Sequence, residues 1–585
     1  MTWNYHFIDL SEAEKHGRRQ TLNRYALYAQ LSALVPATAV LLYRLTKWAV
    51  TATESRNGDY AAVPSSPVRK VRRHSSLGTW SSRLRKARWW LGEDVVAAGM
   101  VFGQRDQWIV GISWAAWLLM LSVLETGEDY LHLTKRFGAV AVSQYPLQYL
   151  LALKSLNPVA YLLRSSHEQV NRWHRVLARV TTALLCLHVS LYLNFFVQRD
   201  RLDRLGDPVV VAGVMAFLCL NLLLTTALRP VRRFSYRLFF IIHLIVGIMM
   251  PLMIIAHANP SNVFMVEALA VFFLDLASRK LDTVTGHATA ESIPGTNLVK
   301  ISASIPNSKV NRFRGHPGSH IYLSIPAAAR KFASPTSISH LLFEFLFNPF
   351  TVADVDNENG DLTLVARNSG GPMTKALGRL ARAAKSNSPS GTDENKIPLS
   401  IEGPYGSVTS FPQLCSEFDR VLLVAGGVGA TFTLPIYRSI ISENPGARVK
   451  MVWAIRDAGD ATWAVTGKEA QALLKDDNVH IFLTGRVVEP EGAAGGSGAG
   501  ENGGSEVEMS AMHRDPRRDQ YTSQHNRKRP DLKRIVDDLF KHGQEERVAV
   551  LVCGPNEMAR ELRKHVGVWV RKGRSVWWHK EGFGF

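Results

Sequence analysis

Long apolar stretches before residue 280 constrain the fold of this chain more than any other feature. Seven of them approach the ~20 residues that cross a hydrocarbon core of ~30 Å, and they predict a helical membrane bundle. They cover residues 24–49, 108–126, 137–156, 175–197, 208–228, 237–258 and 261–278. Polar residues precede the first stretch and no small-residue cleavage site follows, so we expect a tail over 1–23 and a retained helix over 24–49 rather than a signal peptide.

The formal net charge of +19 at pH 7 comes mostly from loops beside the apolar stretches. Because Lys and Arg do not follow an aromatic-laced groove, the charge does not favour nucleic-acid binding. The basic loop 50–107, which we expect to be partly disordered, and the connection 229–237 fall on one side of the membrane when the spans are counted. The positive-inside rule makes that side cytosolic, together with everything after residue 280. The four cysteines predict neither a disulfide framework nor a Cys-rich metal site.

Histidines recur at one spacing on the fourth and sixth helices. His174 and His188 lie fourteen residues apart, and so do His243 and His257. Fourteen residues make close to four helical turns, so both members of a pair face the same way, roughly 21 Å apart along the axis. Since these two helices run in the same direction, we expect His174 to oppose His243 near the cytosolic face and His188 to oppose His257 near the outer face.

Each histidine taken alone could be a hydrogen-bonded core residue. Ionisable groups inside a membrane are costly and usually functional, however, and the repeated spacing is hard to reach by accident. Two neutral imidazoles on opposite faces of a porphyrin fill both axial positions of the iron and leave no site for substrate. The set of four therefore predicts two bis-histidine haems that carry electrons.

The second half of the chain changes to short β-branched and aromatic runs. NLVKISASIP, HPGSHIYLSIP, NPFTVADVD and DLTLVARNSG predict an antiparallel barrel over 285–408. From 415 to 585 strands alternate with helices, which predicts a parallel α/β domain. Within it, residues 488–530 are rich in Gly and Ser, and we expect a disordered insertion. The turn Gly426-Gly427-Val428-Gly429 joins a strand to a helix and could hold a pyrophosphate, although a tight turn without a ligand would look the same.

At these motifs the chain resembles the ferric reductase and NADPH oxidase superfamily. The histidine pairs and the stretch ALRPVRRFSYRLFFIIH are similar to its haem-bearing part, here 108–280. Barrel, GPYG, AGGVGAT, CGP and an aromatic C-terminus resemble ferredoxin-NADP reductase modules in the same order. Seven spans, a terminal Phe-Gly-Phe and no EF-hand are most similar to short fungal metalloreductases. The resemblance implies FAD, two b-type haems and NADPH as cofactors.

The family's flavin contacts map onto two segments. Its barrel segment corresponds to Asn348, Pro349, Phe350, Thr351, Val352 and Ala353, and its FAD-phosphate segment to Arg367, Gly370, Gly371 and Thr374. Two departures concern these segments: asparagine stands where histidine is usual at 348, and Pro372 stands where an aromatic or aliphatic residue is usual. Asparagine keeps a hydrogen bond but no charge, so we expect FAD binding to be retained.

The nicotinamide side is implied in the same way. The resemblance assigns Gly403, Pro404, Tyr405 and Gly406 to the domain junction, Gly426, Gly427, Gly429 and Thr431 to the phosphates, and Cys553, Gly554 and Pro555 to the nicotinamide. Arg456 and Arg486 each follow a strand where a cation could meet a 2′-phosphate, which favours NADPH, although either could be a plain surface arginine. Phe583 is the candidate that stacks on the flavin, with Phe585 as the alternative.

Together these features predict electron transfer from cytosolic NADPH, through FAD and two haems, to an acceptor across a lipid membrane. No acid-base pair or nucleophile for covalent catalysis stands out. Ferric or cupric ions, as free ions or chelates, are the favoured acceptors. A superoxide-generating oxidase acting on dioxygen is the alternative enzymatic function. A non-enzymatic membrane scaffold with a vestigial reductase domain is the alternative from a different functional class. Plasma membrane or endoplasmic reticulum, and accessory subunits, stay open.

Overall fold

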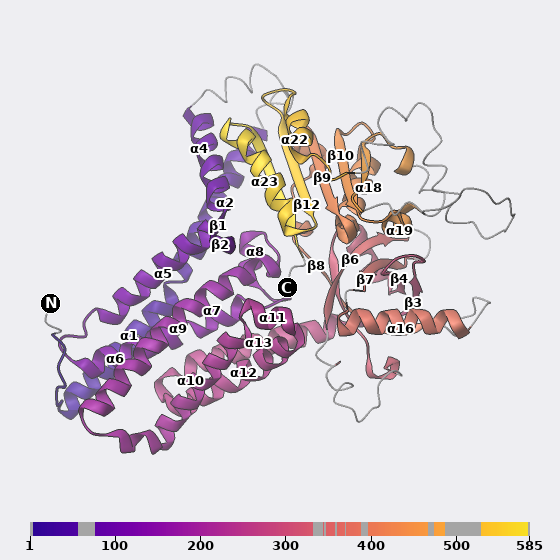
Figure 1. The fold of residues 1–585 in the computed structure, drawn as a ribbon. Helices are drawn as coiled ribbons and strands as arrows, with labels where there is room; N and C mark the ends of the chain where they lie inside the picture. The colour runs from indigo at the N-terminus through magenta and orange to yellow at the C-terminus, as the bar shows by residue number, and fades with distance from the viewer. Residues whose placement is uncertain are drawn as a thin grey trace. The chain divides into compact units, whose positions relative to one another are not determined.

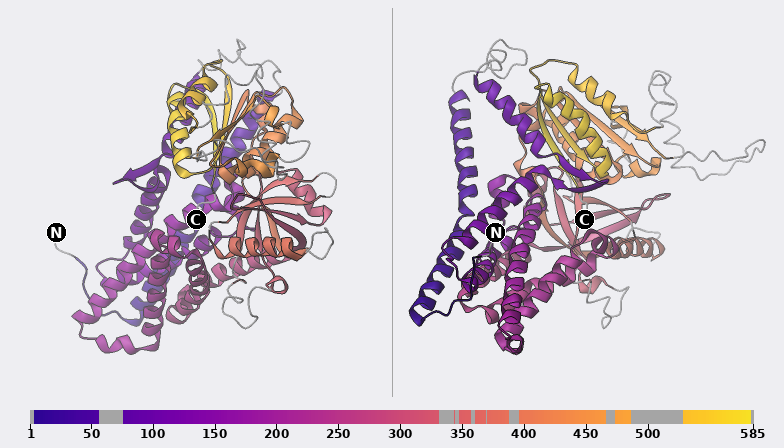
Figure 2. Two further views of the ribbon diagram at one scale, coloured as in Figure 1. Left: turned by 45° about the vertical axis from the view of Figure 1, so that its right-hand side comes forward. Right: turned by 60° about the vertical axis from the view of Figure 1, so that its left-hand side comes forward.

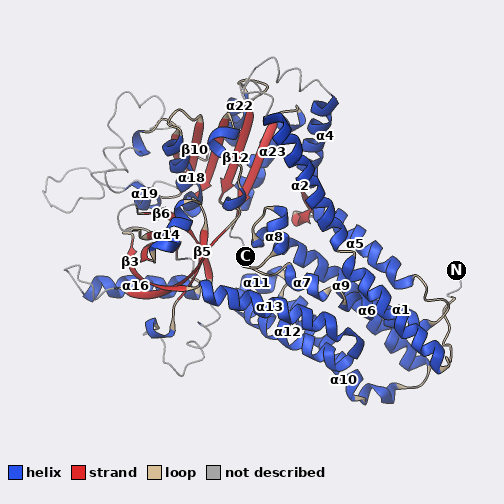
Figure 3. Ribbon diagram, turned by 180° about the vertical axis from the view of Figure 1, so that it is seen from behind, coloured by secondary structure: helices blue, strands red, loops and turns tan. Residues whose placement is uncertain are grey.

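The structure is a computed structural model that describes residues 4–55, 76–330, 343, 347–356, 360–368, 370–387, 396–465, 473–485 and 528–582. The chain divides into two compact units. The first comprises mainly residues 1–58 and 88–283, and the second comprises 59–87 and the β-rich part that begins at Val284. Figure 3 shows the first unit as almost entirely helical, whereas the second carries both large sets of strands.

Six helical segments of the described residues are long and apolar enough to cross a membrane. They are Glu12–Val50, which joins α1 (Glu12–Leu31) to α2 (Leu34–Ser55), then α5 (Arg105–Val123), α9 (His167–Gln198), α10 (Pro208–Thr226), α12 (Tyr236–His257), and Asn259–Asp282, which contains η3 (Asn259–Ser261) and α13 (Asn262–Asp282). Within this unit α5, α6 (Tyr130–Val142) and α9 run side by side, as do α10, α12 and α13 (Figure 1). Apolar side chains cover most of these helices, as expected for a bundle in lipid.

The third expected span, 137–156, differs from the prediction. The chain there forms two shorter helices, α6 (Tyr130–Val142) and α7 (Tyr145–Leu150), which are separated by Ser143 and Gln144. Pro146 lacks an N–H group, so it cannot donate to the carbonyl of Val142, and the helix cannot continue unbroken. Helix α6 contacts α1, α5 and α9, and most of its residues are buried inside the bundle.

Two further boundaries differ from those expected. Helix α1 begins at Glu12, inside the expected tail 1–23, where Ser11 and Glu14 form a reciprocal capping box. The expected loop 50–107 contains regular structure in its described part, namely α4 (Ser76–Leu91), β1 (Asp94–Ala97) and β2 (Met100–Gln104). The remaining connections of the first unit hold the short elements α8 (Pro158–Leu163), η2 (Leu202–Gly206) and α11 (Arg229–Phe234).

The second unit starts with a closed antiparallel barrel in the strand order β3-β4-β7-β6-β5-β8. Its strands are β3 (Val284–Ser292), β4 (Leu298–Ser304), β5 (His320–Ser324), β6 (Asn348–Val355), β7 (Leu362–Arg367) and β8 (Ile397–Tyr405). Alternate residues point inward and form a core that includes the fully buried Ile301, Ile321 and Leu364. Helix α14 (Asn307–Arg314) follows β4, and the amphipathic helix α16 (Pro372–Asn387) packs against β3 (Figure 2).

A five-stranded parallel sheet completes the second unit, in the order β11-β10-β9-β12-β13. The strands are β9 (Arg420–Gly426), β10 (Val449–Ile455), β11 (Val479–Leu483), β12 (Arg547–Cys553) and β13 (Ser575–Glu581), and the main helices are α18 (Ala430–Glu443), α22 (Leu532–Phe540) and α23 (Asn556–Arg571). The predicted fold class, a helical membrane part followed by a barrel and a parallel α/β domain, is confirmed. Residues 488–527 of the expected insertion lie outside the described residues.

Candidate functional site

The four histidines form two pairs across helices α9 and α12. The ring centres of His174 and His243 lie 6.1 Å apart, and those of His188 and His257 lie 6.4 Å apart. We call these the first and the second pair. A metal–imidazole bond of about 2 Å places the metal about 3 Å from a ring centre, so one metal ion held between two imidazoles needs ring centres about 6 Å apart. Both pairs have that separation.

Three of the four rings are also fixed by backbone carbonyls. Ring atom Nδ1 lies 2.9 Å from the carbonyl oxygen of Gln148 in His174, 2.8 Å from that of Thr134 in His188, and 2.7 Å from that of Val209 in His257. A carbonyl only accepts, so each Nδ1 carries the proton, and in His188 and His257 Nε2 keeps a lone pair free for a metal. The Gln148 side-chain amide also lies within hydrogen-bonding distance of both ring nitrogens of His174.

In His243 the ring atom Nδ1 is buried and has no hydrogen-bond partner among the described residues. No group of three or more His, Cys, Asp or Glu residues that could hold a metal ion occurs in the part of the chain that the structure describes. The histidine pairs therefore suit an ion whose other ligands come with it, as the four nitrogens of a porphyrin do.

The barrel brings part of the expected flavin segment beside β5 and β8. Thr351 of β6 pairs in register with His320 of β5, which also pairs with Tyr405 of β8. His320 is only 1% exposed, and its ring contacts those of Tyr322 and Tyr405, which also contact each other. His320 and Tyr322 were missed in the sequence because their strand carries no family motif.

Not every side chain of the segment 348–353 is available to contact a ligand. Val352 belongs to the core of the barrel, and Ala353 packs with the core of the parallel α/β domain. Residues that alternate along a strand face opposite sides, so the six residues from Asn348 to Ala353 cannot all direct side chains at one ligand. Thr351 is the buried hydroxyl of the segment.

The second expected flavin segment lies where β7 leads into α16. Gly370 has a φ of +86°, a conformation that side chains rarely adopt, and the Thr374 hydroxyl donates to the carbonyl of Gly371. Pro372 is the first residue of α16, a position where the missing N–H group costs nothing. Its departure from the family pattern therefore suits the helix that begins there.

Arg367 connects the barrel to the glycine turn. Its guanidinium lies 3.6 Å from the Asp460 carboxylate, and a Cβ atom added to Gly427 would meet Arg367 Nη2 at 3.0 Å. A cation at this place can serve phosphate groups held on either side.

The predicted glycine turn is built at the carboxyl end of β9. Gly427–Gly429 form the single turn η8, Gly427 has a φ of +56°, and α18 begins at Ala430. Trp453 donates from Nε1 to the carbonyl oxygen of Gly427 at 2.9 Å, and the Thr431 hydroxyl donates to that of Val428. Backbone N–H groups at the start of a helix beside a glycine turn form a phosphate site.

The CGP segment lies against this turn. Cys553 pairs in register with Ala425, and a Cβ atom on Gly429 would meet the Cys553 carbonyl oxygen at 2.2 Å. A Cβ atom on Gly426 would meet Pro555 Cδ at 2.6 Å. Glycine thus lets the ends of β9 and β12 approach closely, at the edge where parallel α/β sheets bind ligands.

The two candidate arginines and the two candidate phenylalanines differ in whether the structure describes them. Arg456 directly follows β10 and is exposed, as a residue that meets a 2′-phosphate would be. Arg486, Phe583 and Phe585 lie outside the described residues. On β13 the His579 ring lies 2.8 Å from the Glu581 carboxylate. On β12 the burial of Cys553 raises the pKa of its thiol.

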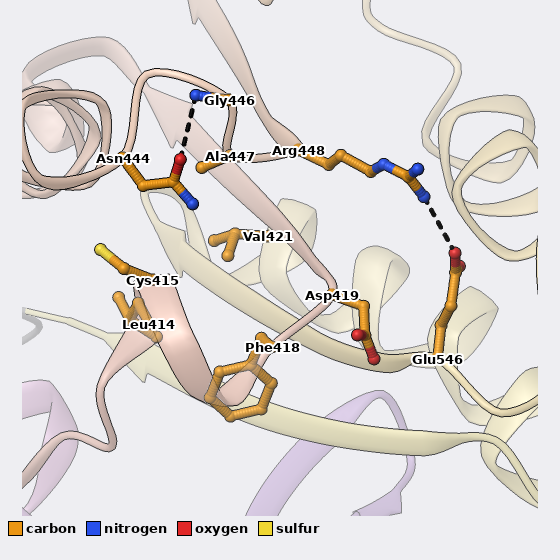
Figure 4. A pocket seen from close by; sticks show the side chains of 10 residues that line it. All are labelled: Leu414, Cys415, Phe418, Asp419, Val421, Asn444, Gly446, Ala447, Arg448 and Glu546. Atoms are coloured by element: carbon orange, nitrogen blue, oxygen red, sulfur yellow. Dashed lines mark hydrogen bonds and ion pairs between the residues drawn. The ribbon is translucent and has the colours of Figure 1, made fainter. Parts of the chain in front are cut away.

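A pocket of about 510 Å³ lies at the opposite edge of the sheet, where β9, β10 and β12 begin (Figure 4). It is lined by Cys415 and Arg448, among others, and by Glu546, whose carboxylate also bonds to Arg420 at 2.8 Å. Ligands of doubly wound sheets bind outside the carboxyl ends of the strands, so this pocket does not belong to the nucleotide site.

Comparison with known proteins finds a family model for each of the three domains. Residues 137–254 match the model of the ferric reductase like transmembrane component, 285–409 that of an FAD-binding domain, and 418–567 that of the ferric reductase NAD binding domain. The probable metalloreductase AIM14 of Meyerozyma guilliermondii is 24% identical over 76% of this chain and 84% of its own.

Two proteins of Schizosaccharomyces pombe are similar as well. Ferric/cupric reductase transmembrane component 2 is 22% identical over 76% of this chain and 80% of its own, and ferric reductase transmembrane component 1 is 24% identical over 74% and 76%. The three matched domains follow one another in the order that the sequence motifs predict. The chain therefore carries a ferric reductase like transmembrane component, followed by an FAD-binding domain and a ferric reductase NAD binding domain.

Proposed function

We propose that this chain is a transmembrane metalloreductase that carries electrons from NADPH, through FAD and two haems, to ferric or cupric ions on the other side of a membrane. One NADPH supplies two electrons, so it reduces two ferric ions to ferrous ions and leaves NADP⁺ and one proton. The observation that carries the proposal is the pair of facing imidazoles at two depths of one helix pair.

The first and the second pair would each hold one haem iron through Nε2. The separations of 6.1 and 6.4 Å fit two axial bonds, and the carbonyl contacts of three Nδ1 atoms leave Nε2 unprotonated. When bound there, haem would supply one-electron transfer, and two histidine ligands would leave its iron no open site for substrate. The residues of this chain fix its position and surroundings.

The order of the elements along the chain supports this direction of transfer. Helix α13 returns beside α12 and ends at Asp282, directly before β3, so the reductase domains attach at the end of the bundle where α12 begins. The first pair lies nearer to that end because His243 is in the second turn of α12 and His257 is its last residue.

Arginines gather at the same end. Arg175 lies close enough to Arg172, Arg179, Arg229 and Arg232 for their charges to repel one another. Such a cluster favours the cytosolic side of a membrane and can bind anionic groups such as haem propionates. The second pair would then serve the acceptor on the opposite side.

In the second unit, Thr351, Tyr405 and Arg367 would hold FAD, together with the start of α16 at Gly370, Gly371 and Thr374. The glycine turn would bind the NADPH pyrophosphate, and Cys553-Gly554-Pro555 would lie beside the nicotinamide. Arg456 and Arg486 would bind the 2′-phosphate, and Phe583 would cover the flavin until the nicotinamide displaces it. A KM for NADPH well below that for NADH, with the difference reduced in Arg456→Ala, would support this assignment.

Two measurements test the proposal. A reduced-minus-oxidised spectrum of the purified protein should show b-type haem, and the double substitution His174→Ala with His243→Ala should remove about half of it. Purified protein given NADPH should reduce a ferric chelate faster than it reduces cytochrome c in a superoxide-dependent reaction. A colourless protein after expression with ample haem would overturn the electron route, and superoxide as the main product would overturn the metal acceptor.

A further inference from the structure

The histidine rings of the second pair lie against glycines of neighbouring helices. A Cβ atom added to Gly138 of α6 would lie 2.8 Å from both Cε1 and Nδ1 of His188. A Cβ atom added to Gly213 of α10 would lie 2.5 Å from the same two atoms of His257. Real Cβ atoms essentially never come this close to another heavy atom, so any residue other than glycine would displace the ring.

Each glycine has the same relation to the carbonyl that its ring contacts. His188 meets the carbonyl oxygen of Thr134, four residues before Gly138, and His257 meets that of Val209, four residues before Gly213. In a helix, residues four apart stack on one face, so a side chain at the later position would cover the carbonyl at the earlier one. The glycine leaves a notch through which the ring reaches a carbonyl that already belongs to the helix ladder.

The same device appears on two helices that are unrelated in sequence. Gly138 on α6 is the last residue of the sequence TKRFG, and Gly213 on α10 is the last residue of VVVAG. The first pair lacks it, because the residue four positions after Gln148 is Ala152, beyond the end of α7, and Nδ1 of His243 has no partner among the described residues. Carbonyl contacts thus fix both rings of the second pair and only one ring of the first.

We propose that Gly138 and Gly213 are positioning residues for the second pair, which hold both Nδ1–H groups on backbone carbonyls and direct both Nε2 atoms at the iron between them. The inference rests on the proposed haem ligation. A hydrogen bond at Nδ1 fixes ring orientation and increases the basicity of the ligand, which favours ferric over ferrous iron. Loss of either notch should therefore loosen the second haem, raise its midpoint potential, or both, and leave the first haem unchanged.

Full-length protein in detergent, reconstituted with haem and FAD, provides the test. Gly138→Ala and Gly213→Ala should each shift or remove about half of the haem signal in a spectroelectrochemical titration, while the other half titrates as in the wild type. The low-spin EPR spectrum should change in one of its two components, because it depends on the orientation of the axial rings. The unchanged half and the retained FAD show that the variant is folded.

Gly111→Ala is the matched control. A Cβ atom on Gly111 of α5 would lie 2.9 Å from Val176 Cγ1, so this substitution also crowds the bundle but touches no histidine ring. It should leave both haem components unchanged. Glycine variants that match Gly111→Ala, or that alter both haems equally, would overturn the inference, whereas a wild type without haem would overturn the proposed function as well.

A double variant distinguishes an effect on the His188 ring from a general disruption of helix packing. If Gly138→Ala acts only through the ring of His188, then adding it to His188→Ala should change neither the yield nor the remaining haem. A further loss in the double variant would show that the alanine disrupts the helix packing itself, which would overturn the positioning role.

Discussion

Gly429 allows a sharp prediction about the nucleotide side. A Cβ atom at this position would lie 2.2 Å from the carbonyl oxygen and 2.7 Å from the carbonyl carbon of Cys553. Both atoms belong to the backbone of β12, which is paired on both sides by β9 and β13, so no rotamer change can relieve the clash. In Gly429→Ala the glycine turn and the end of β12 must move apart by about 1 Å to restore ordinary contact.

Overpacking of this kind costs about 1–3 kcal/mol of stability. For a domain of this size each kcal/mol lowers the unfolding temperature by about 2–4 °C, so we expect a loss of about 2–12 °C. Because the displaced atoms border the expected pyrophosphate and nicotinamide sites, the KM for the nucleotide should rise as well. A penalty of ~1.4 kcal/mol on binding would raise it tenfold.

The assay is NADPH-dependent reduction of ferricyanide by the detergent-solubilised protein, after heating at graded temperatures and across a range of nucleotide concentrations. Gly446→Ala serves as the control, because a Cβ atom there would meet only Asn444 Oδ1, at an ordinary 3.5 Å. If Gly429→Ala and Gly446→Ala inactivate at the same temperature and have the same KM, close packing at the glycine turn does not matter and the reasoning is wrong.

Three further outcomes are expected. Trp453→Phe removes the donor to the Gly427 carbonyl at a fully buried site, so it should cost about 1–3 kcal/mol and raise the KM for the nucleotide, measured by the same assay. Glu546→Ala leaves Arg420 without its buried carboxylate partner and should lower the inactivation temperature, while the KM stays unchanged because that pocket lies at the other edge of the sheet. Burial raises the pKa of the Cys553 thiol, so little thiolate exists at neutral pH; iodoacetamide should label it slowly in the native protein and quickly in urea, as measured by peptide mass spectrometry.

The sequence carried much of the site because its signals are local. The spacing of the histidines is a property of each helix, and the order of the barrel, glycine turn and CGP motif is a property of the chain. Both could be read without contacts. The same reading failed at residues 137–156, where hydropathy suggested one span and the chain forms α6 and α7.

Tertiary structure determined which residues of other elements pack against these side chains. Sequence periodicity turns His188 toward one side of α9, but only the packing of α6 places the Thr134 carbonyl and Gly138 against its ring. His320 likewise meets the ring of Tyr405 through strand pairing, which joins segments about eighty residues apart. Helical phase follows from bonds within a few residues, whereas the choice of partner depends on how distant surfaces pack, and short-range patterns in a sequence do not encode that choice.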